Sequence, residues 1–192
     1  IAGLKQAGTQ VILVSSGAVG AGRSLVKVPQ SLNKVVQRQV LSAVGQVKLL
    51  NIYLSFLANY QLFCAQVLAT KEDFRDRAHY LNMRECFRAL LRDNIIPIVN
   101  ENDVIAVNEL MFTDNDELAG LVAAMLNADA LIILSNIDGV YDGSPQEAGS
   151  QVIPEIDCDD KKVLAVVAPS ESSFGRGGMQ TKLRIAQKAA KV

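Results

Sequence analysis

The chain has 192 residues, 49% of them hydrophobic, and its 19 basic residues nearly balance 20 acidic ones. This length and composition fit one globular domain with a sizeable core. So small a net charge offers no field that would attract nucleic acid or a membrane surface. No apolar run approaches the ~20 residues of a membrane span, and the N-terminus does not match a signal peptide. We therefore expect no nucleic-acid or membrane partner.

Cysteine usage indicates the compartment. Cys64, Cys86 and Cys158 are widely spaced and odd in number, and His79 is the only histidine in the sequence. This pattern argues against a disulfide framework and against a structural zinc site. It suits a reducing environment, so we expect a cytoplasmic protein. His79 stands beside a run of charged residues, and we interpret it as a solvated residue at a helix start rather than a catalytic one.

The first part of the chain predicts a helix end, a strand and a turn. Residues 1–8 have the pattern of the last turns of a helix with Gly8 at its C-terminal cap. Residues 11–14 are a continuous apolar run, typical of a parallel strand buried on both faces. The run ends in the small residues 15–22. Glycines there would let backbone N–H groups approach a phosphate or carboxylate, although a plain tight turn explains them equally well.

Helices and strands then alternate. A long helix is predicted over residues 34–57, where apolar residues recur at helical spacing, with a kink near Gly45. A strand is predicted over 62–69, a helix over 80–91 and a third strand over 95–99. This alternation predicts an α/β fold with a mainly parallel central sheet covered by helices on both faces, a three-layer αβα sandwich.

Two polar clusters surround the third strand. Asn100, Glu101, Asn102 and Asp103 follow it directly, and residues 114–116 (Asp-Asn-Asp) precede a helix expected at about 115–127. A buried strand that ends in polar residues is how α/β proteins present ligand sites. The second cluster alone would be explained as a helix cap. Two clusters around one strand, loop and helix favour a binding site.

The rest of the chain predicts one more strand and a glycine-rich loop. The apolar run 130–134 is expected to be a buried strand whose end would join the ends of the first and third strands at one sheet edge. Residues 142–161 are polar and rich in turn formers, so we expect a surface excursion. The segment 172–182 is a glycine-rich loop that leads into the last helix.

These parts suggest phosphoryl transfer. The glycine-rich loop and Lys182 supply what a polyphosphate needs: approachable N–H groups, a helix start and a point positive charge. Carboxylates such as Asp103 and Asp116 would repel an anion unless a divalent cation or lysines lay between them. A nucleotide, Mg²⁺ and phosphoryl transfer fit together. A carboxylate acceptor would need no catalytic base because it is already ionised at neutral pH, so the protein would work by positioning and by neutralising charge.

Four motifs together resemble the glutamate 5-kinase family of the amino-acid kinase superfamily: SSGAVGAG, IVNENDVI, the DND before a helix of small residues, and GRGGMQTK. They span essentially the whole chain in order. The glycine motif is shared across the superfamily, whereas the SSGA turn with NEND and DND is more specific. The resemblance implies ATP-dependent phosphorylation of the side-chain carboxylate of L-glutamate to γ-glutamyl phosphate, the first step of proline biosynthesis.

The resemblance also assigns roles to residues. Lys182 would stabilise charge on the phosphates, Asp116 would orient lysines or a magnesium ion, and the Gly17 N–H would lie near the transferred group. The substrate-binding positions would be Ser16, Asp103, Asn115, Asn100 and Asn102. The nucleotide-binding positions would be Ser135, Asn136, Arg176, Gly177, Gly178, Met179, Gln180, Thr181 and Lys182. No metal is expected to be held firmly by the protein, because Mg²⁺ would arrive with ATP. Feedback inhibition by L-proline and a homo-oligomer, either dimer or tetramer, are further implications.

The sequence departs from the family pattern in three places. The family's first strand, with its phosphate-binding lysine, is missing, as are the strands after the last helix and the C-terminal domain of many bacterial members. Asn136 stands where the family usually has aspartate. We therefore expect residues 1–192 to be a single amino-acid kinase domain, a fragment truncated at both ends and a poor catalyst by itself. Two alternatives stay open: a related kinase with another acid acceptor, and a non-catalytic amino-acid-sensing domain.

Overall fold

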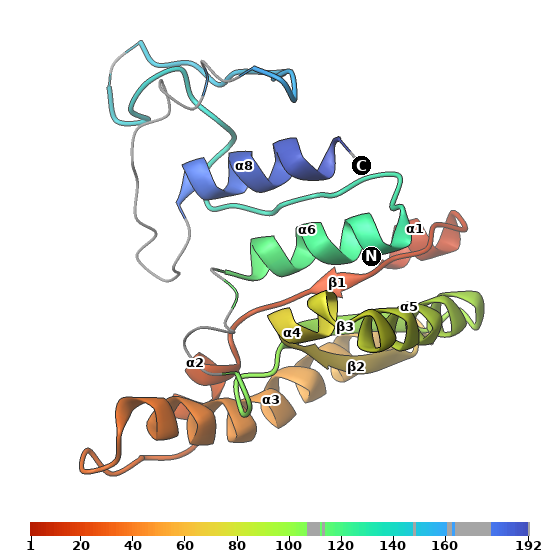
Figure 1. Ribbon diagram of the computed structural model, residues 1–192, viewed down its shortest axis with the longest axis vertical. Coiled ribbons are helices and arrows are strands. Elements are labelled where there is room, and N and C mark those ends of the chain that lie inside the picture. Colours follow the sequence, from red (N-terminus) through yellow and green to blue (C-terminus); the bar gives the residue numbers. More distant parts are fainter. Residues whose placement is uncertain (107–111, 113, 148, 161–162, 164–177, 192) are drawn as a thin grey trace. The chain divides into compact units, whose positions relative to one another are not determined.

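The computed structural model describes residues 1–106, 112, 114–147, 149–160, 163 and 178–191. They belong to two compact units, residues 1–115 and 116–192. In chain order the first unit contains α1 (Ala2–Gln6), β1 (Leu13–Val14), α2 (Ala18–Arg23), α3 (Lys34–Ala58), β2 (Cys64–Ala69), α4 (Lys71–Arg75), α5 (Arg77–Arg92) and β3 (Ile96–Glu101) (Figure 1). The expectation of a single kinase domain stays a prediction.

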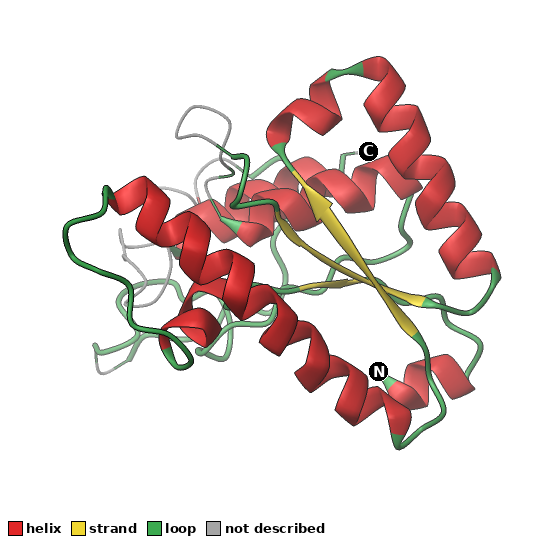
Figure 2. Cartoon of the chain, turned by 90° about the horizontal axis from the view of Figure 1, so that it is seen from below, coloured by secondary structure: helices red, strands yellow, loops and turns green. Residues whose placement is uncertain are grey.

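The first unit is built on a three-stranded parallel sheet with β3 at its centre, between β1 and β2. Val99 of β3 is paired with Val14 on one side and Val67 on the other. The chain steps across the sheet from β1 to β2 and then back to β3, so right-handed crossovers place α3 and α5 on opposite faces. In Figure 2 the two long helices of this unit lie on either side of the strands. The predicted α/β fold is confirmed.

The core of this unit forms where the apolar residues of β3 meet α3. Ile96 and Ile98 are at most 1% exposed and pack with Leu57. Cys64 packs against the same cluster, and burial raises the pKa of its thiol, so it behaves as the small apolar residue that the sequence predicts. On α5, Phe87 is fully buried. The three cysteines are all free thiols, as expected.

α5 starts three residues earlier than predicted because Asp76 caps it. The carboxylate of Asp76 accepts a hydrogen bond from the backbone N–H of His79 at 2.8 Å, which satisfies one of the unpaired donors of the first turn. The His79 ring lies 3.2 Å from Asp73, and its side chain is 60% exposed. Its interpretation as a solvated residue at a helix start is confirmed.

α2 and α3 are in backbone contact, and two glycines make that contact possible. A Cβ atom on Gly45 of α3 would lie 1.7 Å from the carbonyl oxygen of Ala18, and one on Gly22 of α2 would lie 1.9 Å from that of Leu41. Any side chain would overlap these atoms. Gly22 therefore serves helix packing, a role that neither explanation offered for residues 15–22, a ligand-facing turn or a plain tight turn, had included. Gly45 lies within a continuous α-helix, not at a break between two helices.

α3 is the most apolar long helix among the described residues. By length and mean apolar content alone, this helix of 25 residues could cross a membrane, although polar residues interrupt it and it contains no long unbroken apolar run. Helices packed inside proteins pass the same test. One face of α3 does pack here, because Leu57 joins the core of the sheet and Gly45 touches α2.

The second unit contains two described helices, α6 (Asn115–Leu126), which begins at the boundary, and α8 (Met179–Ala189). The two helices lie close enough that a Cβ atom on Gly120 would meet the Ile185 side chain at 2.8 Å. The described part of 142–160 is coil with one antiparallel bridge, between Tyr141 and Val152, as predicted for a surface excursion.

The strand predicted over residues 130–134 is not formed. These residues have no strand partner within the described part of the chain, and Ile132 and Leu134 are 73% and 85% exposed. An apolar run shows that a segment favours burial, but a strand exists only where a neighbour supplies the hydrogen-bond ladder. The expected third polar strand end, at Ser135 and Asn136, is therefore absent from the described sheet, and both residues are exposed.

Candidate functional site

The predicted acid-binding residues gather at the carboxyl end of β3. Asn100 and Glu101 are the last two residues of the strand, two residues beyond its predicted end, and are 4% and 7% exposed. Ladder pairing with Leu68 and Ala69 of β2 carries the strand that far. The Asn102 N–H donates to the Ala69 carbonyl at 2.8 Å, which prolongs the ladder by one bond. The chain then turns, with the Ala106 N–H donating to the Asn102 carbonyl.

The turn places Asp103 against α3. Arg38 Nε donates to Asp103 Oδ1 at 2.9 Å, and its Nη2 also contacts this oxygen and lies 3.2 Å from Glu101 Oε2. Ser42 Oγ donates to Asp103 Oδ2 at 2.8 Å. The two carboxylate side chains are only 7–8% exposed. Arg38 thus lies against two buried carboxylates, and carboxylate oxygens are acceptors that suit a cationic ligand group such as an ammonium.

A second set of contacts joins the two polar clusters of the sequence. The side-chain Nδ2 of Asn115, the first residue of α6, donates to Asn100 Oδ1 at 3.0 Å. Asn100 Nδ2 in turn donates to Gln46 Oε1 on α3 at 2.9 Å. The NEND and DND motifs are therefore parts of one hydrogen-bonded group. A helix cap alone does not account for Asn115, since its side chain binds a residue 15 positions away.

Sequence reasoning missed the contribution of α3. Arg38, Ser42 and Gln46 are spaced by four residues and contact Asp103, Glu101 and Asn100. This spacing puts them on one helix face. The spacing of four was visible in the sequence, but α3 carries other polar residues as well, so the period became informative only once Ser42 and Gln46 were found to be buried.

The turn after β1 adds an exposed edge to this region of the first unit. Ser15 stays in the sheet, with its N–H donating to the Val99 carbonyl at 2.9 Å and its hydroxyl 2.6 Å from that of Tyr53 on α3. The next two residues, Ser16 and Gly17, are exposed. Gly17 has φ +108°, a conformation that disfavours other residues, and it is the N-terminal cap of α2. Ser16 and the Gly17 N–H are thus accessible to a ligand.

In the second unit, Asp116 and Lys182 form an ion pair. Lys182 Nζ lies 2.5 Å from Asp116 Oδ2, and their side chains are 23% and 19% exposed. Asp116 is in the first turn of α6, where its charge complements the helix dipole, and Lys182 is in the first turn of α8. The pair connects two predicted catalytic residues that are 66 positions apart. In this arrangement Asp116 balances the charge of Lys182, and the Lys182 side chain is still partly exposed.

The other predicted nucleotide contacts are only partly described. Gly178 caps α8, and Met179, Gln180 and Thr181 form its first turn with Lys182, all of them partly buried. Arg176 and Gly177 lie outside the described residues. In the described part of the chain, one acidic group with metal-like spacing occurs, Asp157, Cys158 and Asp159. It includes two exposed carboxylates and is separate from every predicted site residue, so it carries no argument for a metal centre.

Comparison with known proteins places the chain in a family. The amino acid kinase family matches residues 1–192. A glutamate 5-kinase from Chlorobaculum tepidum is 55% identical over 192 residues, which is 100% of this chain and 53% of that protein. One from Bacteroides thetaiotaomicron is 53% identical over 99% of the chain and 52% of its own length. One from Lactiplantibacillus plantarum is 40% identical over 98% of the chain and 73% of its length.

The chain thus spans about half the length of the first two of these relatives. The match nevertheless extends over both units and over all four motifs that carried the resemblance. The chain belongs to the amino acid kinase family.

Proposed function

We propose that the protein carrying this chain transfers the γ-phosphoryl group of ATP to the side-chain carboxylate of L-glutamate, the first step of proline biosynthesis. The observation that carries the proposal is the hydrogen bond from Asn115 to Asn100, which joins the two motifs most specific to glutamate 5-kinases. Relatives that bear this name match the chain at 40–55% identity, which supports the same reading.

The acid belongs with the residues of the first unit. We propose that Asp103 and Asn115 meet the amino-acid end of glutamate, helped by Asn100, Asn102 and the exposed Ser16. The Asp103 carboxylate suits an ammonium group, and the half-buried Asn115 side chain offers both an oxygen and an N–H. The Gly17 N–H would contribute a donor to the transferred phosphoryl group.

The nucleotide belongs with the residues of the second unit. Lys182 is a cation in the first turn of a helix, a place that favours phosphate oxygens. We propose that it exchanges its contact with Asp116 for one with the phosphates. We assign the protein no firm magnesium ligand and expect Mg²⁺ to bind with ATP, while Asp116 orients Lys182 before the nucleotide binds. Ser135, Asn136 and residues 176–181 remain proposed nucleotide contacts.

The reaction then needs little acid–base chemistry. The acceptor carboxylate is ionised at neutral pH and attacks the γ-phosphorus, ADP leaves, and no proton has to be removed. The residues named above would bring the two anions together and offset their charge. This fits a chain whose only histidine lies in an exposed helix start.

The test is phosphoryl transfer by the full-length protein that carries this chain, with ATP, Mg²⁺ and L-glutamate, and with hydroxylamine to trap the acyl phosphate as a hydroxamate. Aspartate and N-acetylglutamate are assayed in parallel, and ATP is omitted as a control. Hydroxamate that requires both glutamate and ATP supports the proposal. Signal only with another acid would change the substrate, and silence with all three acids would favour an amino-acid-sensing domain.

Three further expectations accompany this proposal. Feedback inhibition by L-proline and assembly into a dimer or tetramer are implied by the resemblance and stay predictions. A cytoplasmic location is proposed from the three free cysteines and their spacing.

A further inference from the structure

Gln46 is a buried polar residue that the proposed reaction does not yet use. It lies in α3 and is 7% exposed. Its Nε2 atom is buried and has no hydrogen-bond partner among the residues that the structure describes. An unpartnered buried donor costs folding free energy, and an apolar side chain of the same size would avoid that cost. Any advantage of glutamine at this position must therefore come from its side-chain oxygen, Oε1, which accepts a hydrogen bond.

That oxygen ends a chain of hydrogen bonds whose direction is set by the backbone. The Glu101 N–H can only donate, and it donates to Asn100 Oδ1 at 2.8 Å. The amide of Asn100 is therefore oriented with Nδ2 toward Gln46, whose Oε1 accepts at 2.9 Å. Both ends of the Asn100 amide are then satisfied inside the protein.

The same orientation controls Asn115. Since Asn100 Oδ1 can only accept, Asn115 turns its Nδ2 toward it, at 3.0 Å. Its Oδ1 then lies on the side of the amide away from Asn100. An oxygen held in this way is an acceptor for an ammonium group, whereas a reversed amide would present N–H groups to it.

We infer that Gln46 is a positioning residue for the acid substrate: by accepting from Asn100 Nδ2, it anchors the Asn100 amide in the orientation that the Glu101 N–H sets, and so keeps Asn100 Oδ1 in place to hold the amide of Asn115 for an amino acid. The inference rests on the proposed function and adds a residue to it. Gln46 would act on the substrate through Asn100 and not by direct contact, because its Nε2 atom is fully buried. The competing interpretation is that Gln46 only fills space between α3 and β3.

The experiment compares Gln46→Met and Gln46→Glu in the full-length protein, with Gln37→Met as the control. Methionine keeps the size and removes the acceptor. Glutamic acid keeps an acceptor oxygen, and burial would raise the pKa of its carboxyl and hold it neutral. Gln37 is on the same helix, but its Nε2 donates to the carbonyls of Gln30 and Leu32 near the start of α3.

We expect Gln46→Met to raise KM for L-glutamate by about tenfold through misplacement of the substrate, with KM for ATP and the melting temperature nearly unchanged. Stability should hold because the substitution also removes the unpartnered Nε2. Gln46→Glu and Gln37→Met should keep the wild-type KM. A Gln46→Glu variant with a KM for L-glutamate about tenfold above that of wild type would overturn the inference, and this comparison with wild type decides it even if Gln46→Met does not fold.

A double variant tests whether Gln46 acts through Asn115. In an Asn115→Ala background, adding Gln46→Met should change KM for glutamate by less than about twofold, because coupled residues are not additive. Independent, multiplicative effects would overturn the inference, as would a parallel rise of both KM values. A wild-type protein that makes no glutamate hydroxamate would instead refute the proposed function, which separates the two failures.

Discussion

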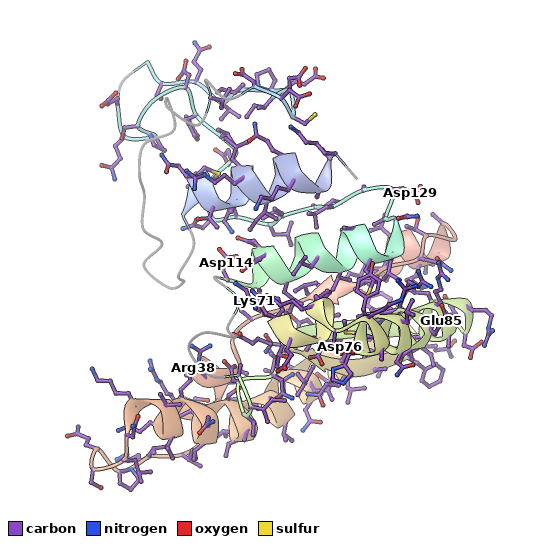
Figure 3. The ribbon with its side chains drawn as sticks, viewed as in Figure 1. Arg38, Lys71, Asp76, Glu85, Asp114 and Asp129 are labelled. Carbon is purple, nitrogen blue, oxygen red and sulfur yellow. The ribbon has the colours of Figure 1, made fainter. Side chains whose placement is uncertain are left out.

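Arg38 and Asp103 are 65 positions apart in the sequence, yet two nitrogens of the arginine contact one oxygen of the aspartate. The same guanidinium lies 3.2 Å from Glu101. One cation thus holds the end of β3 and the following turn against α3. Figure 3 shows Arg38 projecting from α3. The planar fork of arginine suits such a shared contact better than a point charge does.

Removing this cation should destabilise the first unit. Arg38→Met leaves the carboxylates of Glu101 and Asp103 buried near each other without this counter-charge. We expect the free energy of unfolding to fall by about 3 kcal/mol, measured by urea denaturation. Arg38→Lys should recover part of the loss, and Gln37→Met should have little effect. A loss below about 0.5 kcal/mol would mean that the contact behaves as an exposed ion pair.

The contact between α2 and α3 predicts opposite effects for two glycines, Gly45 in α3 and Gly20 in α2. Gly45→Ala puts a Cβ atom 1.7 Å from the Ala18 carbonyl oxygen. We expect a loss of about 3 kcal/mol or more from this overlap with backbone. Gly20→Ala is the matched control, because its Cβ would meet nothing within 4 Å. It should stabilise by up to about 1 kcal/mol through helix propensity, and equal effects of the two changes would contradict the close packing.

Asp103→Asn tests the proposed acid site. The substitution keeps the size and removes one negative charge, so we expect KM for glutamate to rise by about ten- to hundredfold, as for loss of a charge-assisted hydrogen bond. KM for ATP should change little. Initial rates at varied glutamate and fixed ATP, and the reverse, measure both constants. An equal rise in both would show that Asp103 does not belong specifically to the acid site.

Lys182→Ala tests the proposed phosphate site. We expect kcat to fall by about a hundredfold, as when one donor to a developing charge is removed. KM for ATP should be affected less, because the glycine-rich loop remains. Lys188→Ala is the control, since Lys188 is an exposed residue in the last turn of the same helix. An unchanged kcat in Lys182→Ala would exclude this lysine from the reaction.

The cap of α5 predicts a pH dependence. The hydrogen bond from the His79 N–H lowers the pKa of Asp76 below its ordinary value of 3.8. A carboxyl with a lowered pKa stabilises the fold above its unfolded-state pKa, and this contribution is lost as the pH falls through the folded-state value. The carboxylate of Asp76, labelled in Figure 3, is therefore expected to stabilise the fold at neutral pH and not in strong acid.

The contribution of Asp76 to stability is measured by thermal unfolding of Asp76→Ala and wild type over a range of pH values. The variant should be less stable at neutral pH, and the difference should shrink below about pH 4. Asp76→Asn should stay close to wild type at neutral pH, because asparagine is also a good N-terminal cap. A difference between Asp76→Ala and wild type that is constant down to strong acid would show that the ionised carboxylate is not responsible.

The sequence by itself determined the family and the order of the main helices and strands in the first unit, although the short helices α2 and α4 were not predicted. Periodicity and caps are local properties, so the strands at 62–69 and 95–99 and the helix at 34–57 are found within a few residues of their predicted limits. The two polar clusters also stood out, because carboxylates and amides after a buried strand have few purely structural explanations.

Tertiary structure alone decided which side chains meet. Gln46 contacts Asn100 because of the way α3 lies across the sheet. Gly22 packs against Leu41 because α2 approaches α3 closely. Residues 130–134 show that a local pattern is not sufficient. Their apolar pattern predicted a strand, but no strand partner for them is present in the described residues. The reason is physical: local preferences act along the chain, whereas hydrogen-bond partners and packing are supplied by residues that are distant in sequence.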